Sequence, residues 1–280
     1  MPAAVTLVDD AGARIRLDTP ASRIISLAPH LTELVYAAGA GKKLIAVTEY
    51  SNFPEAAKIL PRVGSSSAID LEKMVSLKPD LVLVWKSGTP LAHQLRLRQL
   101  GIPVAVFELQ HLEDIGNALD RIGQLAGTTV LAQKTKTRFV ARLAKLQKQY
   151  SQLQPVSVFY QIWGQPIMSV NRRHMINDVI RLCGGRNIFA ELKPLAPVVD
   201  VESVISKAPQ VIIASAAGGV RPQWLADWRQ WKNIPAVRDD NLFYIDSDLI
   251  ARSGPRALLG AEILCRDLDS VRRSKLKNTG

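Results

Sequence analysis

The feature that most constrains this chain is an internal repeat of fourteen residues. The segment 70–83, DLEKMVSLKPDLVL, is matched 130 positions later by the segment 200–213, DVESVISKAPQVII. Asp, Glu, Ser and Pro recur at the same offsets in both copies. In each copy the Asp can cap a helix, the Glu lies where the helix macrodipole favours a carboxylate, and the Pro ends the helix before an apolar run. The repeat therefore predicts two related lobes with similar local structure.

Short apolar runs alternate with helical patterns in both halves of the chain. Runs without polar alternation are typical of parallel strands that are buried on both faces. In the first half we expect strands at 24–28, 44–48, 81–85 and 104–108, and helices near 32–38, 71–77, 90–100 and 112–125. In the second half we expect strands at 156–161, 211–215 and 242–246, and helices near 175–182, 201–207, 223–231 and 255–271. The pattern predicts an α/β fold with two Rossmann-like lobes, preceded by a hairpin at 5–17.

A single long helix is predicted from residue 128 to about residue 152, between the two halves. Its apolar residues follow a four-three-four-three spacing that lines one helical face. They are Phe139, Leu143, Leu146, Tyr150 and Leu153. The helix contains six bases and no acid, so we expect its other face to be solvated. The predicted organisation is an N-terminal hairpin (1–20), a first lobe (21–127), an interlobe helix (128–153) and a second lobe (154–280), with a ligand cleft between the lobes.

The net charge of +11 does not predict binding to nucleic acid. The excess bases lie mainly on the long helix and in the C-terminal segment 272–277. No aromatic side chains are interleaved with these bases as stacking platforms, and no known nucleic-acid-binding module is present. We expect a solvated basic surface and no nucleic-acid partner.

Neither a membrane span nor a signal peptide is evident. No apolar run reaches the eighteen residues of a transmembrane helix, and residues 1–10 lack the order of basic, apolar and small residues that a signal peptide has. Either the protein is cytosolic, or a signal peptide preceded this sequence and was removed.

The two cysteines, Cys183 and Cys265, allow two interpretations. They can be two isolated buried thiols, or they can form a disulfide, and the sequence alone does not decide between these. A disulfide would close a loop of 83 residues counting both ends. It would contribute about 4 kcal/mol in the chain-entropy model and would indicate an oxidising compartment.

Aromatic and charged side chains follow the predicted strands in both halves. Tyr50, Trp85 and Trp163 lie at or just after the ends of three strands, and Asp248 and Arg252 follow a fourth. Ligands of open parallel sheets bind beyond the carboxyl ends of the strands. Any one of these aromatic residues could equally belong to the core. Their recurrence at strand ends favours a pocket for a large, mostly apolar ligand.

Other kinds of site have little support. The segment Gly39 to Lys43 lacks the first Gly and the Ser or Thr of a phosphate-binding loop. The four histidines have no metal-ligand spacing, and no nucleophile motif is present. We therefore predict neither a metal site nor a catalytic site. An α/β enzyme such as a chelatase acting on a tetrapyrrole, and an adaptor protein that binds no ligand, remain as alternatives.

The chain resembles the periplasmic substrate-binding proteins of ABC importers in which one long helix joins two lobes. Within that class it is most similar to the vitamin B12 (cobalamin) binding proteins. The resemblance covers about 22–268 and is carried by the segments 23–34, 50–54, 70–82, 183–189 and 252–256. It implies a monomeric, non-enzymatic protein that captures a corrinoid in the periplasm, without a resident cofactor, and delivers it to an importer permease. Because one continuous helix is predicted to join the lobes, we expect small opening motions rather than wide hinge closure.

The resemblance also implies roles for individual residues. Glu72 and Glu202 match two glutamates that bind arginines of the permease. Cys183 and Cys265 match a disulfide. Tyr50, Trp85, Asp248 and Arg252 match corrinoid-contacting positions, and Ser66 and Ala196 stand where the pattern has aromatic residues. Because of these two departures, haem and iron-siderophore ligands remain alternatives, and Tyr50 would be the iron ligand of a haem.

Overall fold

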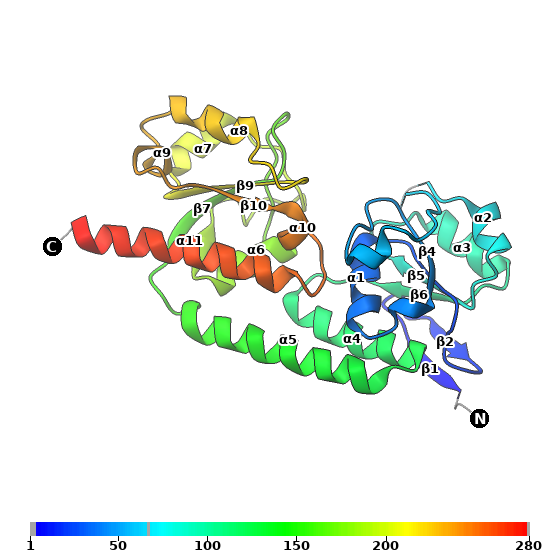
Figure 1. Cartoon of the computed structure of the whole chain (residues 1–280). Helices are drawn as coiled ribbons and strands as arrows, with labels where there is room; N and C mark the ends of the chain where they lie inside the picture. Colours follow the sequence, from blue (N-terminus) through cyan, green and yellow to red (C-terminus); the bar gives the residue numbers. More distant parts are fainter. Residues whose placement is uncertain (1–3, 66–67, 279–280) are drawn as a thin grey trace. The chain divides into compact units, whose positions relative to one another are not determined.

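The computed structural model describes residues 4–65 and 68–278, with side chains described as far as Ser274. The chain forms two compact units (Figure 1). Unit 1 comprises Met1–Leu109 and Glu113–Val140, and unit 2 comprises Gln110–Leu112 and Ala141–Gly280. Each unit is built around a four-stranded, all-parallel sheet. The predicted α/β class and the parallel sheets are confirmed, and the predicted lobe boundaries and interlobe cleft stay predictions.

Unit 1 begins with the predicted antiparallel hairpin of β1 (Val5–Val8) and β2 (Arg14–Leu17). Its sheet has the order β4-β3-β5-β6. These strands are β3 (Ile24–Ser26), β4 (Leu44–Val47), β5 (Leu81–Trp85) and β6 (Val104–Phe107). Its helical segments are α1 (Pro29–Ala37), η1 (Gly41–Lys43), η2 (Glu55–Ala57), α2 (Leu71–Ser76) and α3 (Leu91–Gln99), and α4 (Leu112–Ala126) begins at the border of the unit.

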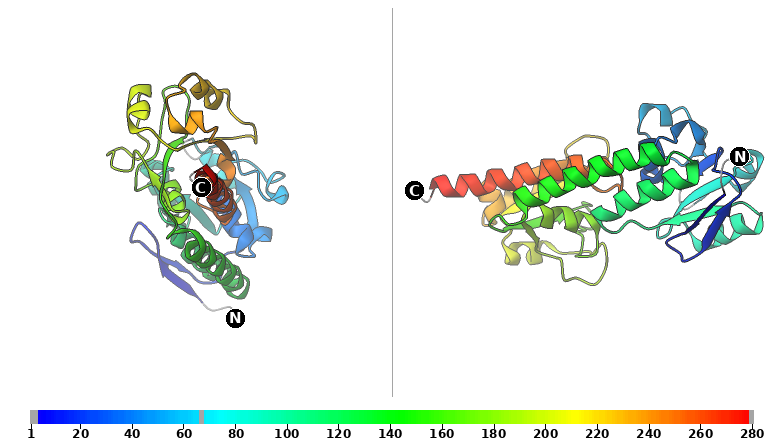
Figure 2. Two further views of the ribbon diagram at one scale, coloured as in Figure 1. Left: turned by 90° about the vertical axis from the view of Figure 1, so that its left-hand side faces the viewer. Right: turned by 90° about the horizontal axis from the view of Figure 1, so that it is seen from below.

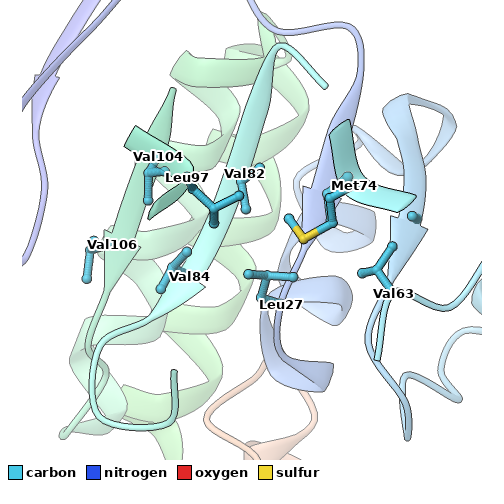
Figure 3. Close-up of a cluster of buried hydrophobic side chains, with 10 residues drawn as sticks. Leu27, Val63, Met74, Val82, Val84, Leu97, Val104 and Val106 are labelled. Carbon is cyan, nitrogen blue, oxygen red and sulfur yellow. The ribbon is translucent and has the colours of Figure 1, made fainter. Parts of the chain in front are cut away.

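The core of unit 1 joins one face of the sheet to α2 and α3 (Figure 3). Met74 of α2 and Leu97 of α3 are fully buried against Val82 and Val84 of β5. Burial of a side chain of this size stabilises a fold by about 1.5 to 3 kcal/mol. Helix α2, which carries the first copy of the repeated acids, is therefore fixed to the sheet.

Unit 2 has a sheet of order β10-β9-β7-β8. Its strands are β7 (Val156–Gln161), β8 (Gly185–Asn187), β9 (Val211–Ala216) and β10 (Leu242–Asp246). Its helical segments are α6 (Met175–Leu182), α7 (Val201–Lys207), α8 (Gln223–Ala226), η3 (Asp227–Gln230), α9 (Pro235–Arg238), α10 (Ser247–Ile250) and α11 (Ala257–Asn278). Its core includes Phe159, with edge-to-face contacts to Phe189 and Trp228 at 5.7 and 5.5 Å between ring centroids.

The long helix α5 (Thr129–Tyr150) is continuous, as predicted (Figure 2). Its predicted apolar face is buried from Phe139 to Tyr150, whereas Leu153 lies beyond the end of the helix. The expectation that the bases are solvated needs a correction for two of them. Lys136 pairs with Asp120 at 3.1 Å, and Arg142 pairs with Glu262 at 2.5 Å. The Arg142 hydrogen bond, against the opposing effect of partial burial, lowers the pKa of Glu262.

The helix caps predicted from the repeat are present in both units. The Asp70 carboxylate accepts a hydrogen bond from the Lys73 amide at 2.9 Å, at the start of α2. The Asp200 carboxylate accepts one from the Ser203 amide at 2.6 Å, at the start of α7. Hydrogen bonds from the side chain and the backbone amide of Ser203 lower the pKa of Asp200. The two helices therefore begin in the same way.

Candidate functional site

The carboxyl ends of the strands of unit 1 lie at one edge of its sheet, because all four strands are parallel. Trp85 is the last residue of β5, and Tyr50 follows the end of β4. Both predicted aromatic residues therefore lie at the sheet edge where ligands of this architecture bind. Ser66, the third predicted residue of this lobe, lies outside the described residues.

Tyr50 projects its ring from a constrained turn. Its φ of 63° is in the left-handed region, which is uncommon for a residue with a side chain, and its relative exposure is 76%. Polar groups hold the turn to the sheet. The Thr32 hydroxyl lies 3.2 Å from the Ser51 hydroxyl and 3.0 Å from the Ser26 hydroxyl. Strained backbone that holds an exposed aromatic ring in place is typical of binding sites.

Trp85 is half-buried and closely packed. The ring of His30 meets it edge-to-face, at 5.3 Å between centroids and 89° between planes. A Cβ atom at Gly88 would lie 1.8 Å from the Trp85 ring, so only glycine allows this ring position. His30 is at the start of α1 but does not cap it. Its packing against Trp85 was missed by the sequence analysis, because nothing in the chain order relates position 30 to position 85.

The corresponding edge of unit 2 carries Trp163, just after β7. Trp163 has a relative exposure of 60%, and its indole N–H donates to the Gln165 carbonyl at 2.9 Å. Isolated bridges pair it with Met168 and pair Met168 with Val198, which is 61% exposed. Because residues paired across strands share a face, these three side chains form an apolar row. The row lies close in sequence to Ala196, which is itself half-buried.

Asp248 and Arg252 follow β10 at the same edge of the unit 2 sheet. The Asp246 carboxylate accepts a hydrogen bond from the Asp248 amide at 2.9 Å, which starts α10. Asp248 and Arg252 form an ion pair at 2.8 Å, with side chains 20% and 14% exposed. Burial, together with the nearby carboxylates of Asp246 and Asp248, raises the pKa of Tyr244. The pair presents charged hydrogen-bonding groups in a partly desolvated position, where such groups bind polar ligands strongly.

Glu72 and Glu202 are exposed in the first turns of α2 and α7. Their equivalent positions follow from the repeat. Each carboxylate lies at the positive end of a helix whose cap is another acid, Asp70 or Asp200. The arrangement gives each unit an exposed acidic surface on an otherwise basic chain.

Cys183 and Cys265 form a disulfide, which decides between the two interpretations that the sequence left open. Their Cα atoms are 4.6 Å apart and both residues are fully buried. The bond joins the C-terminal end of α6 to α11.

Within the described part of the chain, no group of three or more His, Cys, Asp or Glu side chains is placed to hold a metal ion. None of the described helices is both long and apolar enough to cross a membrane.

The periplasmic binding protein family model matches residues 24–249 of this chain. The chain belongs to the periplasmic binding protein family. The matched range contains the described residues of both candidate sheet-edge sites except Arg252, which lies just beyond it, and it ends before Cys265 of the disulfide.

Relatives of this family member cover almost the whole chain. A vitamin B12-binding protein of Vibrio parahaemolyticus is 36% identical over 260 residues, which are 91% of this chain and 92% of that protein. The crystal structure of the periplasmic vitamin B12 binding protein BtuF of Vibrio cholerae superposes with a TM-score of 0.82 at 37% identity. The superposed region covers 90% of this chain and 98% of the BtuF chain. The periplasmic haem binding protein HutB of Vibrio cholerae has a TM-score of 0.77 at 24% identity, a likeness of fold alone.

Proposed function

We propose that this binding protein is a non-enzymatic periplasmic carrier that captures a corrinoid and delivers it to the permease of an ABC importer. The observation that carries the proposal is the placement of aromatic residues at the carboxyl edges of both sheets. Tyr50 and Trp85 belong to one edge and Trp163 to the other. The disulfide is in keeping with the oxidising periplasm.

The chemistry of these residues suits a corrin. Aromatic rings bind a large flat macrocycle by stacking, and each such contact contributes about 0.5 to 1.5 kcal/mol beyond the area that it buries. The amide side chains of a corrinoid need both donors and acceptors, and the Asp248–Arg252 pair supplies a carboxylate and a guanidinium. The row of Trp163, Met168 and Val198, in which Trp163 and Val198 are exposed, supplies apolar surface near the position of Ala196.

Haem is the second candidate ligand, and one observation favours it. The Tyr50 side chain is highly exposed and held on a fixed turn, as a tyrosinate ligand of haem iron would need to be. The names of the relatives that are 36% or more identical favour the corrinoid.

A titration with both ligands tests the assignment. Purified protein is titrated separately with cyanocobalamin and with haem, followed by visible spectroscopy and calorimetry. The proposal predicts stoichiometric binding of cyanocobalamin and no tyrosinate-type spectrum with haem. Tight haem binding through Tyr50 without cobalamin binding would reject the corrinoid assignment, and turnover of a tetrapyrrole would reject the non-enzymatic role.

We further propose that Glu72 and Glu202 dock the carrier to basic side chains of the permease. Two equivalent acids on two related units suit a partner with two basic surfaces. The exposure of both glutamates and the duplicated capping around them support this role.

A further inference from the structure

A pocket in unit 2 contains three of the five tryptophans of the chain. Trp224, Trp228 and Trp231 occur within eight residues, in α8, in η3 and directly after η3. The pocket has a volume of about 280 Å³, and Asp227 is among the residues that line it. Val201, the first residue of α7, also lines it, so the pocket adjoins the helix that carries Glu202 (Figure 1).

The floor of the pocket is rigidly held. Trp228 is 4% exposed, and its indole N–H donates to the buried Gln161 side-chain oxygen at 2.8 Å. Its ring also packs edge-to-face against Phe159. A Cβ atom at Gly164 would lie 2.6 Å from the Trp224 ring, so the Trp224 ring lies directly against this loop. The pocket is therefore formed before any partner arrives.

The walls are accessible to a partner. Trp231 is 38% exposed and Trp224 is half-buried, whereas Asp227 and Gln230 are exposed. Indole faces attract cations through their quadrupole, and a carboxylate beside them adds direct charge attraction. The volume of about 280 Å³ leaves room for the head of a single basic side chain.

We propose that this pocket binds an arginine or lysine side chain of the permease, as a second contact beside Glu202. The inference rests on the docking role proposed above and deepens it. The charge is complementary, because Asp227 and Glu202 both favour a basic partner surface. The sequence of unit 1 contains a single tryptophan, Trp85, at the carboxyl edge of its sheet, so unit 1 cannot repeat this cluster of three tryptophans. The pocket would therefore make the two docking surfaces unequal and would fix which unit meets which surface of the permease.

The first test uses a model side chain and needs no permease. N-acetyl-arginine N-methylamide is titrated into the full-length protein, and the indole N–H signals of the pocket tryptophans are followed by NMR. N-acetyl-citrulline N-methylamide, which has the same shape without the charge, is the matched ligand. We expect saturable shifts with the arginine compound and at least fivefold weaker binding of the citrulline compound. Equal binding of the two, or binding of neither, would overturn the proposal.

Variants locate the site. Asp227→Asn and Trp231→Ala are each expected to weaken binding of the arginine compound at least fivefold, whereas Trp231→Phe, which keeps an aromatic face, restores most of it. Asp18→Asn removes the same charge from an exposed position of unit 1 and is expected to change nothing. An unchanged affinity in Asp227→Asn would contradict the assignment.

The second test uses the reconstituted permease and separates this inference from the docking proposal. Asp227→Asn and Trp231→Ala should each weaken association with the permease about tenfold without changing the affinity for cyanocobalamin. If Glu202→Lys weakens docking and these variants do not, the pocket inference is wrong and the docking proposal stands. If neither kind of variant weakens docking, both are wrong.

Discussion

His174 caps helix α6 with a neutral imidazole. Its Nδ1 accepts a hydrogen bond from the Ile176 amide at 3.1 Å, and burial lowers the pKa of His174 to about 4. Between pH 6.5 and pH 4 the unfolded chain binds a proton at this residue and the folded chain does not. The free energy of unfolding therefore falls as the pH drops through this range.

We expect His174→Asn to remove this part of the acid sensitivity, because Asn caps helices and does not titrate. The variant should gain stability relative to the parent protein by about 2 kcal/mol between pH 7 and pH 4.5. Urea unfolding at the two pH values measures the difference. A stability difference that does not change with pH would contradict the role of His174.

Gly88 controls the position of Trp85. In Gly88→Ala the new methyl group would collide with the Trp85 ring, so the ring must move from its present place. We expect corrinoid affinity to fall at least tenfold, which is about 1.4 kcal/mol. Calorimetry measures the affinity, and a thermal melt confirms that the variant is folded. Full affinity in a folded Gly88→Ala protein would mean that the Trp85 position is irrelevant to binding.

At the scale of elements, the disulfide joins α6 to α11 in unit 2. We expect Cys183→Ala with Cys265→Ala to lower the free energy of unfolding by about 4 kcal/mol, because the unfolded chain loses a long cross-linked loop. Denaturant unfolding of both proteins without reductant gives this difference. Thiol titration of the unreduced, unfolded parent should find no reactive cysteine, and two reactive thiols would show that the bond is absent.

Most elements of the fold could be predicted because their signals are local. The strands β5, β7 and β10 begin and end at the expected residues, since each is a short apolar run bounded by polar or turn residues. The prediction of one helix over 223–231 was wrong, because α8 ends at Ala226 and the tighter η3 follows. The strand β8 was missed because Gly-Arg-Asn has no apolar pattern. Helices α9 and α10 were missed because four residues are too few to show a helical period.

The candidate site could be predicted only in part. The positions of Tyr50, Trp85, Trp163, Asp248 and Arg252 could be predicted because a parallel sheet places its strand ends at one edge, and their roles in binding stay predictions. The ion pair between Asp248 and Arg252, the packing of His30 on Trp85 and the tryptophan pocket depend on side-chain directions. Periodicity and propensity do not encode those directions. The roles of Ser66 and Ala196 in ligand binding stay predictions.

At the scale of the whole molecule, the chain is proposed to bind a ligand and a permease through separate residues. Reversing charge in Glu72→Lys with Glu202→Lys should abolish transport by the reconstituted importer and leave cyanocobalamin affinity unchanged. Both glutamates are exposed and neither caps its helix, so the variant should fold, with only a small loss of stability from a lysine at the positive end of each helix. Transport at the parental rate would mean that the acids only stabilise the helix starts.

The central claim is that the aromatic side chains at the carboxyl edge of the unit 1 sheet bind a corrinoid. The most direct measurement is calorimetric titration of cyanocobalamin into the parent protein and into Tyr50→Ala with Trp85→Ala, with the exposed Val130→Ala on α5 as control. The account predicts one tight site in the parent and in the control, and at least hundredfold weaker binding in the double variant, about 2.7 kcal/mol. Absence of binding to the parent, or equal affinity in the double variant, would contradict it.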